Sequence, residues 1–249
     1  MRRRVVSRVL GPAAPGRVHV SAGRLVIAID GPAASGKSST AQWVAERLGV
    51  RHVDSGALYR ALTAAAVRAA GDPDAWTEAD VLRHAGRVAL APTGRSFDVV
   101  IDGRPAGEEI RAPEVTRHVS LVAGMPGVRA WVNDRVRAAA RDHDVVVDGR
   151  DIGTAVFPDA PLKVFLVADP WERARRRLLQ RLQRTPAEAE IAEETDRLVQ
   201  RDARDATQTV PARDAVVVDT TYLTQEQQVE RIVALARAVT HRDDVTSGG

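Results

Sequence analysis

Apolar residues along this chain follow two alternating patterns, short continuous runs and longer stretches with helical spacing. The short runs, which are typical of buried strands, cover residues 25–29, 50–53, 145–148, 162–167 and 215–218. The stretches with helical spacing cover residues 38–48, about 57–70, about 113–123, 126–141, 170–183, 186–200 and 224–238. Strands that alternate with helices indicate a doubly wound sheet, so we predict an α/β fold with five parallel strands.

A different pattern interrupts this alternation between residues 86 and 112. Thr77 and Asp80 have the spacing of a capping box, which predicts a helix that ends near Gly86. Short β patterns follow at 87–90 and 98–101, with turn residues between them. We therefore expect a small antiparallel β insertion at about 86–112.

The two ends of the chain differ in composition from the middle. Residues 1–24 are rich in arginine and contain no acidic residue, and residues 241–249 are mostly polar. An acid-free basic start also resembles a transit peptide, and faintly a secretory signal, but Arg8 interrupts its short apolar stretch. We predict a basic disordered arm at 1–24, one domain at 25–240 and a polar tail at 241–249.

Composition limits the classes of function. The 36 basic residues are nearly balanced by 33 acidic ones, and aromatic residues make up only 4% of the chain, which favours small anionic substrates over nucleic acid. The sequence has no cysteine and no apolar stretch long enough to span a membrane, so we expect a cytoplasmic protein. The six histidines lack metal-ligand spacing, and we interpret all of them, His52 included, as surface or packing residues.

Residues 31–38 carry the most specific motif, a complete G-x-x-x-x-G-K-S phosphate-binding loop between a predicted strand and a predicted helix. Glycines let backbone N–H groups approach phosphates, Lys37 supplies a charge to the β/γ oxygens, and the Ser38 hydroxyl reaches Mg²⁺. Lys37 is one of only two lysines in the chain, and its strand and helix context argues against a chance glycine-rich turn. The predicted ATP contacts are Gly31, Pro32, Ala33, Ala34, Ser35, Gly36, Lys37, Ser38 and Ser39.

Further charged residues follow other predicted strands or end a helix. Arg60 lies shortly after the second strand, Asp148 ends the third, Arg150 follows it, and Arg201 begins an Arg-Asp cluster. Ligands of open α/β sheets bind at the carboxyl ends of the strands, where Asp148 would face Mg²⁺ through water. Taken alone, each arginine is best interpreted as part of a solvated ion pair. Their joint placement around a phosphate loop instead predicts that they bind a second phosphate.

Taken together, the motifs resemble those of bacterial-type cytidylate kinases, in the nucleoside monophosphate kinase group. The matching segments are residues 30–39, 54–60, 110–115 with 119–120, 126–129, 148–154, 157–159, 173–177 and 201–205, within a match from about 25 to 238. The resemblance implies phosphorylation of CMP and dCMP by ATP with Mg²⁺, in a monomer whose insertion at 86–112 binds the nucleoside monophosphate and whose region 170–205 forms a helical lid.

The resemblance also implies a role for individual residues. Lys37, Arg60, Arg150 and Arg201 would be catalytic, and Arg177, in an arginine-rich run from 173 to 184, would reach the triphosphate. The substrate contacts would be Ser55, Arg60, Ser120, Arg129, Arg150, Asp151, Arg201 and Asp205. Among these, the three arginines hold the acceptor phosphate, Ser120, Arg129 and Asp151 read the cytosine edge, and Asp205 binds the ribose.

One position departs from the family pattern. Gln208 stands where members usually carry an arginine, and the following stretch 209–214 is about four residues shorter. Arg204 or Arg213 could substitute for that arginine, or acceptor affinity or sugar preference could shift. Alternatives to CMP are UMP, dTMP or shikimate as acceptor, or a catalytically inactive nucleotide sensor, although the cytosine-reading residues argue against the first three.

Overall fold

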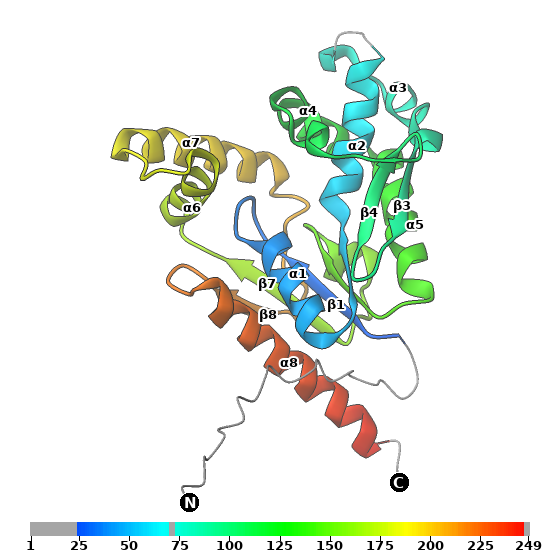
Figure 1. The fold of residues 1–249 in the computed structure, drawn as a ribbon, viewed down its shortest axis with the longest axis vertical. Helices are drawn as coiled ribbons and strands as arrows, with labels where there is room; N and C mark the ends of the chain where they lie inside the picture. The colour runs from blue at the N-terminus through cyan, green and yellow to red at the C-terminus, as the bar shows by residue number, and fades with distance from the viewer. Residues whose placement is uncertain (1–23, 70–72, 247–249) are drawn as a thin grey trace, which may run out of the picture.

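The computed structural model describes residues 24–69 and 73–246, and its centre is a sheet of five parallel strands (Figure 1). The strands lie in the order β2-β6-β1-β7-β8. Their bounds are β1 (Val26–Asp30), β2 (Arg51–Asp54), β6 (Val145–Asp148), β7 (Leu162–Val167) and β8 (Val216–Asp219). The predicted α/β fold with five parallel strands is confirmed, and β7 has the predicted bounds.

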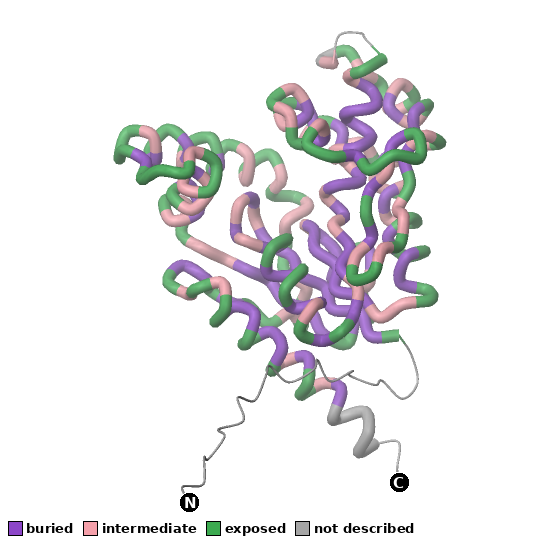
Figure 2. Tube along the Cα trace, viewed as in Figure 1, coloured by how far each residue is buried: buried purple, intermediate pink, exposed green. Residues whose placement is uncertain are grey.

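Helices cover both faces of this sheet because its central strands are apolar on both sides. In β1, Ile27 and Ile29 pack with α1 (Lys37–Leu48) and α8 (Gln225–Thr246), whereas Val26 and Ala28 pack into the opposite cluster. That second cluster contains α2 (Ser55–Arg68), α4 (Pro113–Gly124) and α5 (Pro126–Arg141). Buried residues therefore run continuously through the sheet and along the inner sides of the helices (Figure 2).

The predicted insertion is a three-stranded antiparallel sheet. It consists of β3 (Val88–Pro92), β4 (Phe97–Ile101) and β5 (Arg104–Pro105), the last of which was not predicted. The capping box of Thr77 and Asp80 starts α3 (Glu78–Leu82) as predicted, but α3 ends before Gly86 and a 3-10 turn η2 (Ala85–Arg87) follows. Two further 3-10 turns are η1 (Pro73–Ala75) and η3 (Glu108–Arg111), and a π-helical turn η4 (Ile152–Val156) follows β6.

Helices α6 (Pro170–Leu182) and α7 (Glu188–Asp205) form an antiparallel pair on one side of the phosphate loop, and α2, α4 and the small sheet lie on the other (Figure 1). Helix α7 runs five residues past the predicted Gln200. Helix α8 continues to Thr246, beyond the predicted end at 238, because no glycine or proline stops it before Gly248. The predicted tail is thus helical backbone up to 246, and its last three residues lie outside the described residues, as do residues 1–23 of the arm predicted at 1–24. Across 24–69 and 73–246, no helix combines the length and the apolar character needed to cross a membrane.

Candidate active site

A single cleft of about 1390 Å³ contains nearly all of the residues predicted for the site. From the predicted set, its wall includes Ala33, Ala34, Ser35, Gly36, Lys37, Ser38, Ser39, Ser55, Arg60, Ser120, Arg129, Asp148, Arg150, Asp151, Arg177, Arg201 and Asp205. Gly31 and Pro32 are the two predicted residues that the wall does not include. The volume exceeds that of an ordinary single-ligand pocket, so the cleft has room for two nucleotides.

The phosphate loop connects β1 to α1, and its glycines meet two separate demands. Gly31 has φ +149°, and a Cβ there would lie 2.3 Å from the Leu166 carbonyl oxygen, so only glycine fits against β7. Gly36 has φ +86° and caps α1 at its N-terminus, which directs N–H groups of the first turn into the cleft. The close packing at Gly31 explains why this glycine lies behind the cleft wall.

Lys37 lies buried within the loop. Its Nζ donates to the Pro32 carbonyl oxygen at 2.6 Å and to Ser35 Oγ at 3.4 Å. Burial lowers the pKa of Lys37 well below its ordinary value, and the positive charge of Arg150 lowers it further. A negative charge that enters the cleft beside Lys37 would oppose this shift, because a nearby anion favours the charged form of a lysine.

Asp148, at the end of β6, joins the phosphate loop to β2. Its Oδ2 accepts a hydrogen bond of 2.6 Å from Ser38 Oγ, and its Oδ1 lies 2.7 Å from His52 Nε2. Its carbonyl oxygen accepts from Ser55 Oγ at 2.7 Å. Hydroxyl and carboxylate oxygens are the ligands that suit Mg²⁺, directly or through water, so this pair of side chains fits the ion predicted from the sequence.

His52 is buried, as the prediction of surface or packing histidines allows, but that prediction missed its place in the cleft. It is buried in the cleft wall against Asp148. Burial alone would lower its pKa, but the hydrogen bond and negative charge of Asp148, with a further contribution from Asp54, raise it above the ordinary value. Burial also raises the pKa of Asp54, as does the charge of Asp148. The sequence alone did not show that β2 pairs with β6, and this pairing aligns Asp54 with Asp148.

Three arginines from separate segments line the same cleft. Arg150 Nε and Arg201 Nε lie 3.5 and 3.7 Å from Asp205 Oδ2, and both of these buried Nε atoms lack a hydrogen-bond partner among the described residues. Arg60 donates from NH1 to the Ile110 carbonyl oxygen at 3.2 Å and to Thr116 Oγ1 at 3.1 Å. Burial, followed by the charge of Arg150, lowers the pKa of Arg201 to about 10. The structure thus concentrates positive charge where the sequence predicts a second phosphate.

Arg129 and Asp151 form a mostly buried ion pair beside these arginines. Arg129 lies on α5, whereas Asp151 precedes the π-helical turn η4, which is held by the Asp30 carboxylate. The two oxygens of Asp30 each accept a backbone N–H at 2.8 Å, from Ile152 and Gly153. Burial raises the pKa of Asp151, and Arg129 opposes that rise. Ser120, on α4, lines the same part of the cleft.

Helices α6 and α7 are joined to the phosphate loop by one buried arginine. Arg173 NH1 donates to the Ala33 carbonyl oxygen at 2.7 Å and lies 2.6 Å from Asp202 Oδ2. Asp202 Oδ1 in turn accepts the Ala33 N–H at 3.1 Å. The N-terminal end of α6 and the C-terminal part of α7 are therefore both fixed to the loop.

The six arginines of the 173–184 run do not share one environment. Arg176 and Arg177 line the cleft, and Arg177 Nε lies 3.1 Å from the buried carboxylate of Glu194. Arg175 and Arg181 pair with acidic residues of α6 and α7. Arg184, which was predicted to lie on the same helix, falls beyond the end of α6 and pairs with Glu190. Only part of the run is thus placed to meet a triphosphate.

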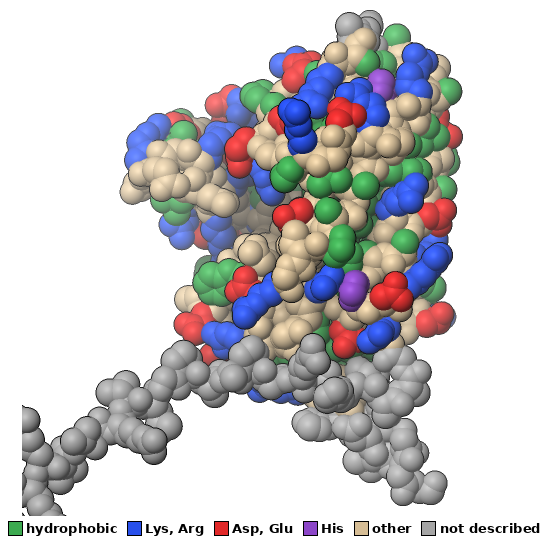
Figure 3. Space-filling model, turned by 45° about the vertical axis from the view of Figure 1, so that its right-hand side comes forward, with side chains coloured by type: hydrophobic (Ala, Val, Ile, Leu, Met, Phe, Trp, Pro, Cys, Tyr) green, Lys and Arg blue, Asp and Glu red, His purple; other side chains and the backbone are tan. Residues whose placement is uncertain are grey.

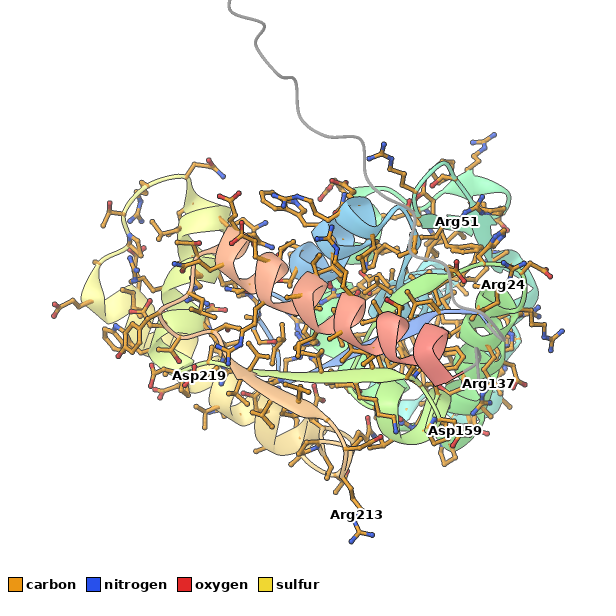
Figure 4. All side chains as sticks on the ribbon, turned by 90° about the horizontal axis from the view of Figure 1, so that it is seen from below. Arg24, Arg51, Arg137, Asp159, Arg213 and Asp219 are labelled. Atoms are coloured by element: carbon orange, nitrogen blue, oxygen red, sulfur yellow. The ribbon has the colours of Figure 1, made fainter. Side chains whose placement is uncertain are left out.

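Gln208 itself lies in the cleft wall, where it contacts Arg129. The two arginines considered as substitutes for the family's usual arginine, Arg204 and Arg213, are both exposed and do not line the cleft. Figure 4 shows Arg213 pointing away from the sheet. Neither residue therefore replaces a cation at this position.

Comparisons with known proteins identify the family. The family model described as cytidylate kinase matches residues 27–238. Cytidylate kinases from Bordetella bronchiseptica and Thermus thermophilus are 44% and 42% identical over 233 and 214 residues, which are 89% and 86% of this chain and 99% of each relative. A bifunctional pantoate ligase/cytidylate kinase from Synechococcus is 42% identical over 227 residues, 88% of this chain but 42% of that protein. A shikimate kinase structure from Bacteroides thetaiotaomicron covers 85% of this chain and 97% of its own, at 15% identity and a TM-score of 0.45. The family model's match over residues 27–238 and the identity of 42–44% to cytidylate kinases establish that the protein belongs to the cytidylate kinase family.

Proposed function

We propose that this protein transfers the γ-phosphoryl group of ATP to CMP and dCMP, yielding ADP with CDP or dCDP. Family membership supports a cytidylate kinase activity. The observation that carries the proposal is that Arg60, Arg150 and Arg201 face one cleft together with the phosphate loop. Two sites for phosphate in one cleft fit a reaction between two nucleotides.

The donor end of the cleft binds the triphosphate. Backbone N–H groups of the loop surround the phosphates, and Lys37 supplies its charge to the β/γ oxygens. Ser38 and Asp148 would hold Mg²⁺, and the ion would supply positive charge to the transferring phosphoryl group. Arg177 contacts the triphosphate from α6.

The acceptor phosphate binds at the opposite end. Arg60, Arg150 and Arg201 hold it in line with the γ-phosphorus through their guanidinium groups. No general base is required, because a phosphate monoester, with a second pKa near 6, is already mostly dianionic at pH 7. Acceleration comes from positioning and from positive charge around the reacting oxygens.

The pyrimidine is read by a carboxylate and a guanidinium. Cytosine offers an amino donor to Asp151 and acceptors at N3 and O2 to Arg129. Uracil presents the opposite pattern at C4 and N3, so that each mispaired buried group costs about 1–3 kcal/mol. Ser120 completes the set that reads the base, Asp205 binds the ribose, and Ser55 fixes the main chain beside the acceptor.

Family membership also supports the remaining assignments. The small sheet within 86–112 belongs to the part that binds the nucleoside monophosphate, and region 170–205 is a lid that closes over the triphosphate and excludes water. The protein acts as a monomer in the cytoplasm. Its substrates are small molecules and not nucleic acid, in keeping with the mixed acidic and basic side chains on the face in Figure 3.

A coupled assay of ADP release over a panel of acceptors tests the proposal. CMP and dCMP should give the highest kcat/KM, UMP and dTMP should be poor, and shikimate should be inactive. The variant Lys37→Ala is the matched control, since it should abolish turnover with every acceptor. A higher kcat/KM for UMP or dTMP than for CMP would show that the proposed acceptor is wrong. Binding of ATP without turnover of any acceptor would indicate a nucleotide sensor.

A further inference from the structure

We propose that Gln208 is a positioning residue that holds Arg129 in place and thereby sets the discrimination between cytosine and uracil. This inference rests on the proposed function and assigns its base selectivity to a residue outside the set that reads the base. Gln208 lies in the turn that follows α7, where its backbone N–H donates to the Asp205 carbonyl oxygen at 3.0 Å. Its side chain reaches across the cleft to α5.

The contact completes a set of acceptors around Arg129. Its NH1 donates to Gln208 Oε1 at 2.9 Å and to the Ala123 carbonyl oxygen at 3.3 Å, while its NH2 donates to Asp151. Because a guanidinium is planar, acceptors on two of its nitrogens fix both its plane and its rotation. Without Gln208, NH1 keeps only the Ala123 carbonyl oxygen at 3.3 Å, a long and weak hydrogen bond, and NH2 keeps only the carboxylate that is itself used to read the base.

The chemistry of the partner determines which end of the amide is used. A guanidinium has donors only, so the Gln208 oxygen must face Arg129 and its NH₂ group is directed elsewhere. A side chain without an oxygen at the same distance cannot take this role. A carboxylate can, because it retains the acceptor.

Discrimination depends on how firmly Arg129 is held. Uracil N3–H meets a guanidinium N–H, and that repulsion opposes binding only if Arg129 cannot turn aside. Cytosine binding itself pulls Arg129 into the reading position, so it needs the anchor less. Removal of the anchor should therefore improve UMP relative to CMP.

The ratio of kcat/KM for CMP to that for UMP is the informative quantity, because the two acceptors share the same phosphate and ribose. Any effect of Gln208 on the phosphate site cancels in this ratio. We expect the ratio to fall about fivefold in Gln208→Leu, the effect of one lost hydrogen bond. Gln208→Asn, which is too short to reach Arg129, should behave in the same way and provides a second variant if the first does not fold.

Two further variants separate positioning from a general structural role. Gln208→Glu keeps the acceptor oxygen and should restore the ratio to within about twofold of wild type, even if its charge weakens binding of both nucleotides. Gln200→Ala, on the exposed side of α7, is the matched control and should leave the ratio unchanged. Thermal unfolding of each variant shows whether it is folded, and dissociation constants for CMP and UMP are measured alongside kcat and KM.

The outcomes are distinct. A wild-type protein that phosphorylates neither CMP nor UMP would refute the proposed function and this inference with it. An active wild type whose ratio is the same in Gln208→Leu and Gln208→Asn would overturn the inference alone. A ratio that falls equally in Gln208→Glu would also overturn it, because the acceptor oxygen would then not be the feature that matters.

Discussion

Asp148 connects two segments of the cleft wall. Its carboxylate is shared between the Ser38 hydroxyl of the phosphate loop and His52 of β2. Such a carboxylate is oriented from both sides, and the second hydrogen bond restricts it to one rotamer. The histidine therefore stabilises the arrangement that the proposed Mg²⁺ requires, without being a ligand itself.

We predict that His52→Leu weakens the response to Mg²⁺ more than it weakens acceptor binding. Loss of the partner on Oδ1 leaves Asp148 oriented by Ser38 alone, and loss of such an outer partner typically costs about tenfold or more in metal affinity. The Mg²⁺ concentration for half-maximal rate should rise by about that factor, whereas the KM for CMP should change little. The Mg²⁺-dependent rise in Tm with ATP present should shrink in parallel. His143→Leu, at a position that does not line the cleft, is the control.

At the acceptor end, we predict that Asp151→Asn raises relative activity toward UMP. An asparagine offers an NH₂ donor to the uracil carbonyl at C4, where the carboxylate opposes it. The CMP/UMP ratio of kcat/KM should fall about tenfold, since one mispaired buried group is exchanged between the two substrates. An unchanged ratio would refute the assignment of Asp151 as a reader of the base.

Which residues could be predicted depended on whether their role is encoded locally. The phosphate loop is a continuous motif, and Arg60, Arg150 and Arg201 follow strands or end a helix, so their convergence followed from sheet topology. His52 and Gln208 act through partners 96 and 79 residues away in sequence. No local pattern encodes such contacts, because they require the pairing of β2 with β6 and the position of α7 relative to α5.

At the scale of elements, apolar periodicity gave β7 and α5 their observed bounds, because a glycine or proline lies close to their ends or an apolar run stops there. The errors occur where such signals are missing. Helix α8 continues through a polar segment without a stop signal, and β5 has only two residues. The π-helical turn η4 was also missed, since it exists because Asp30 binds two of its backbone N–H groups.

The turn from β1 into the phosphate loop offers a test at this scale. We predict that Gly31→Ala destabilises the fold by about 3 kcal/mol or more, because it combines a strained φ with a Cβ pressed against the main chain of β7. Chemical denaturation measures the change. Gly94→Ala is the matched control, since its Cβ would meet no atom within 4 Å, and it should shift stability by less than about 0.5 kcal/mol. Equal effects of the two substitutions would contradict the close approach to Leu166.

At the scale of the whole molecule, the cleft lies between two groups of elements on either side of the phosphate loop. Helices α6 and α7 contribute Arg177 and Arg201, while α2 and α5 contribute Arg60 and Arg129. Arg173 and Asp202 fix α6 and α7 to the loop, so that a ligand held by the loop and the arginines contacts both groups at once. One molecule that spans both ends should therefore bind better than either nucleotide alone.

The probe for this arrangement is adenosine joined 5′ to 5′ to cytidine through five phosphates. Once one end has bound, the other is confined near its own site, and such linkage commonly raises affinity about 100-fold or more. At equal concentrations above saturation, a 100-fold gain adds about 2.7 kcal/mol to the free energy of unfolding, so the linked compound should raise Tm well beyond ATP or CMP. Arg150→Ala should reduce the gain with CMP and with the linked compound but not with ATP. A linked compound that raised Tm no further than ATP would mean that the two ends of the cleft do not face one another.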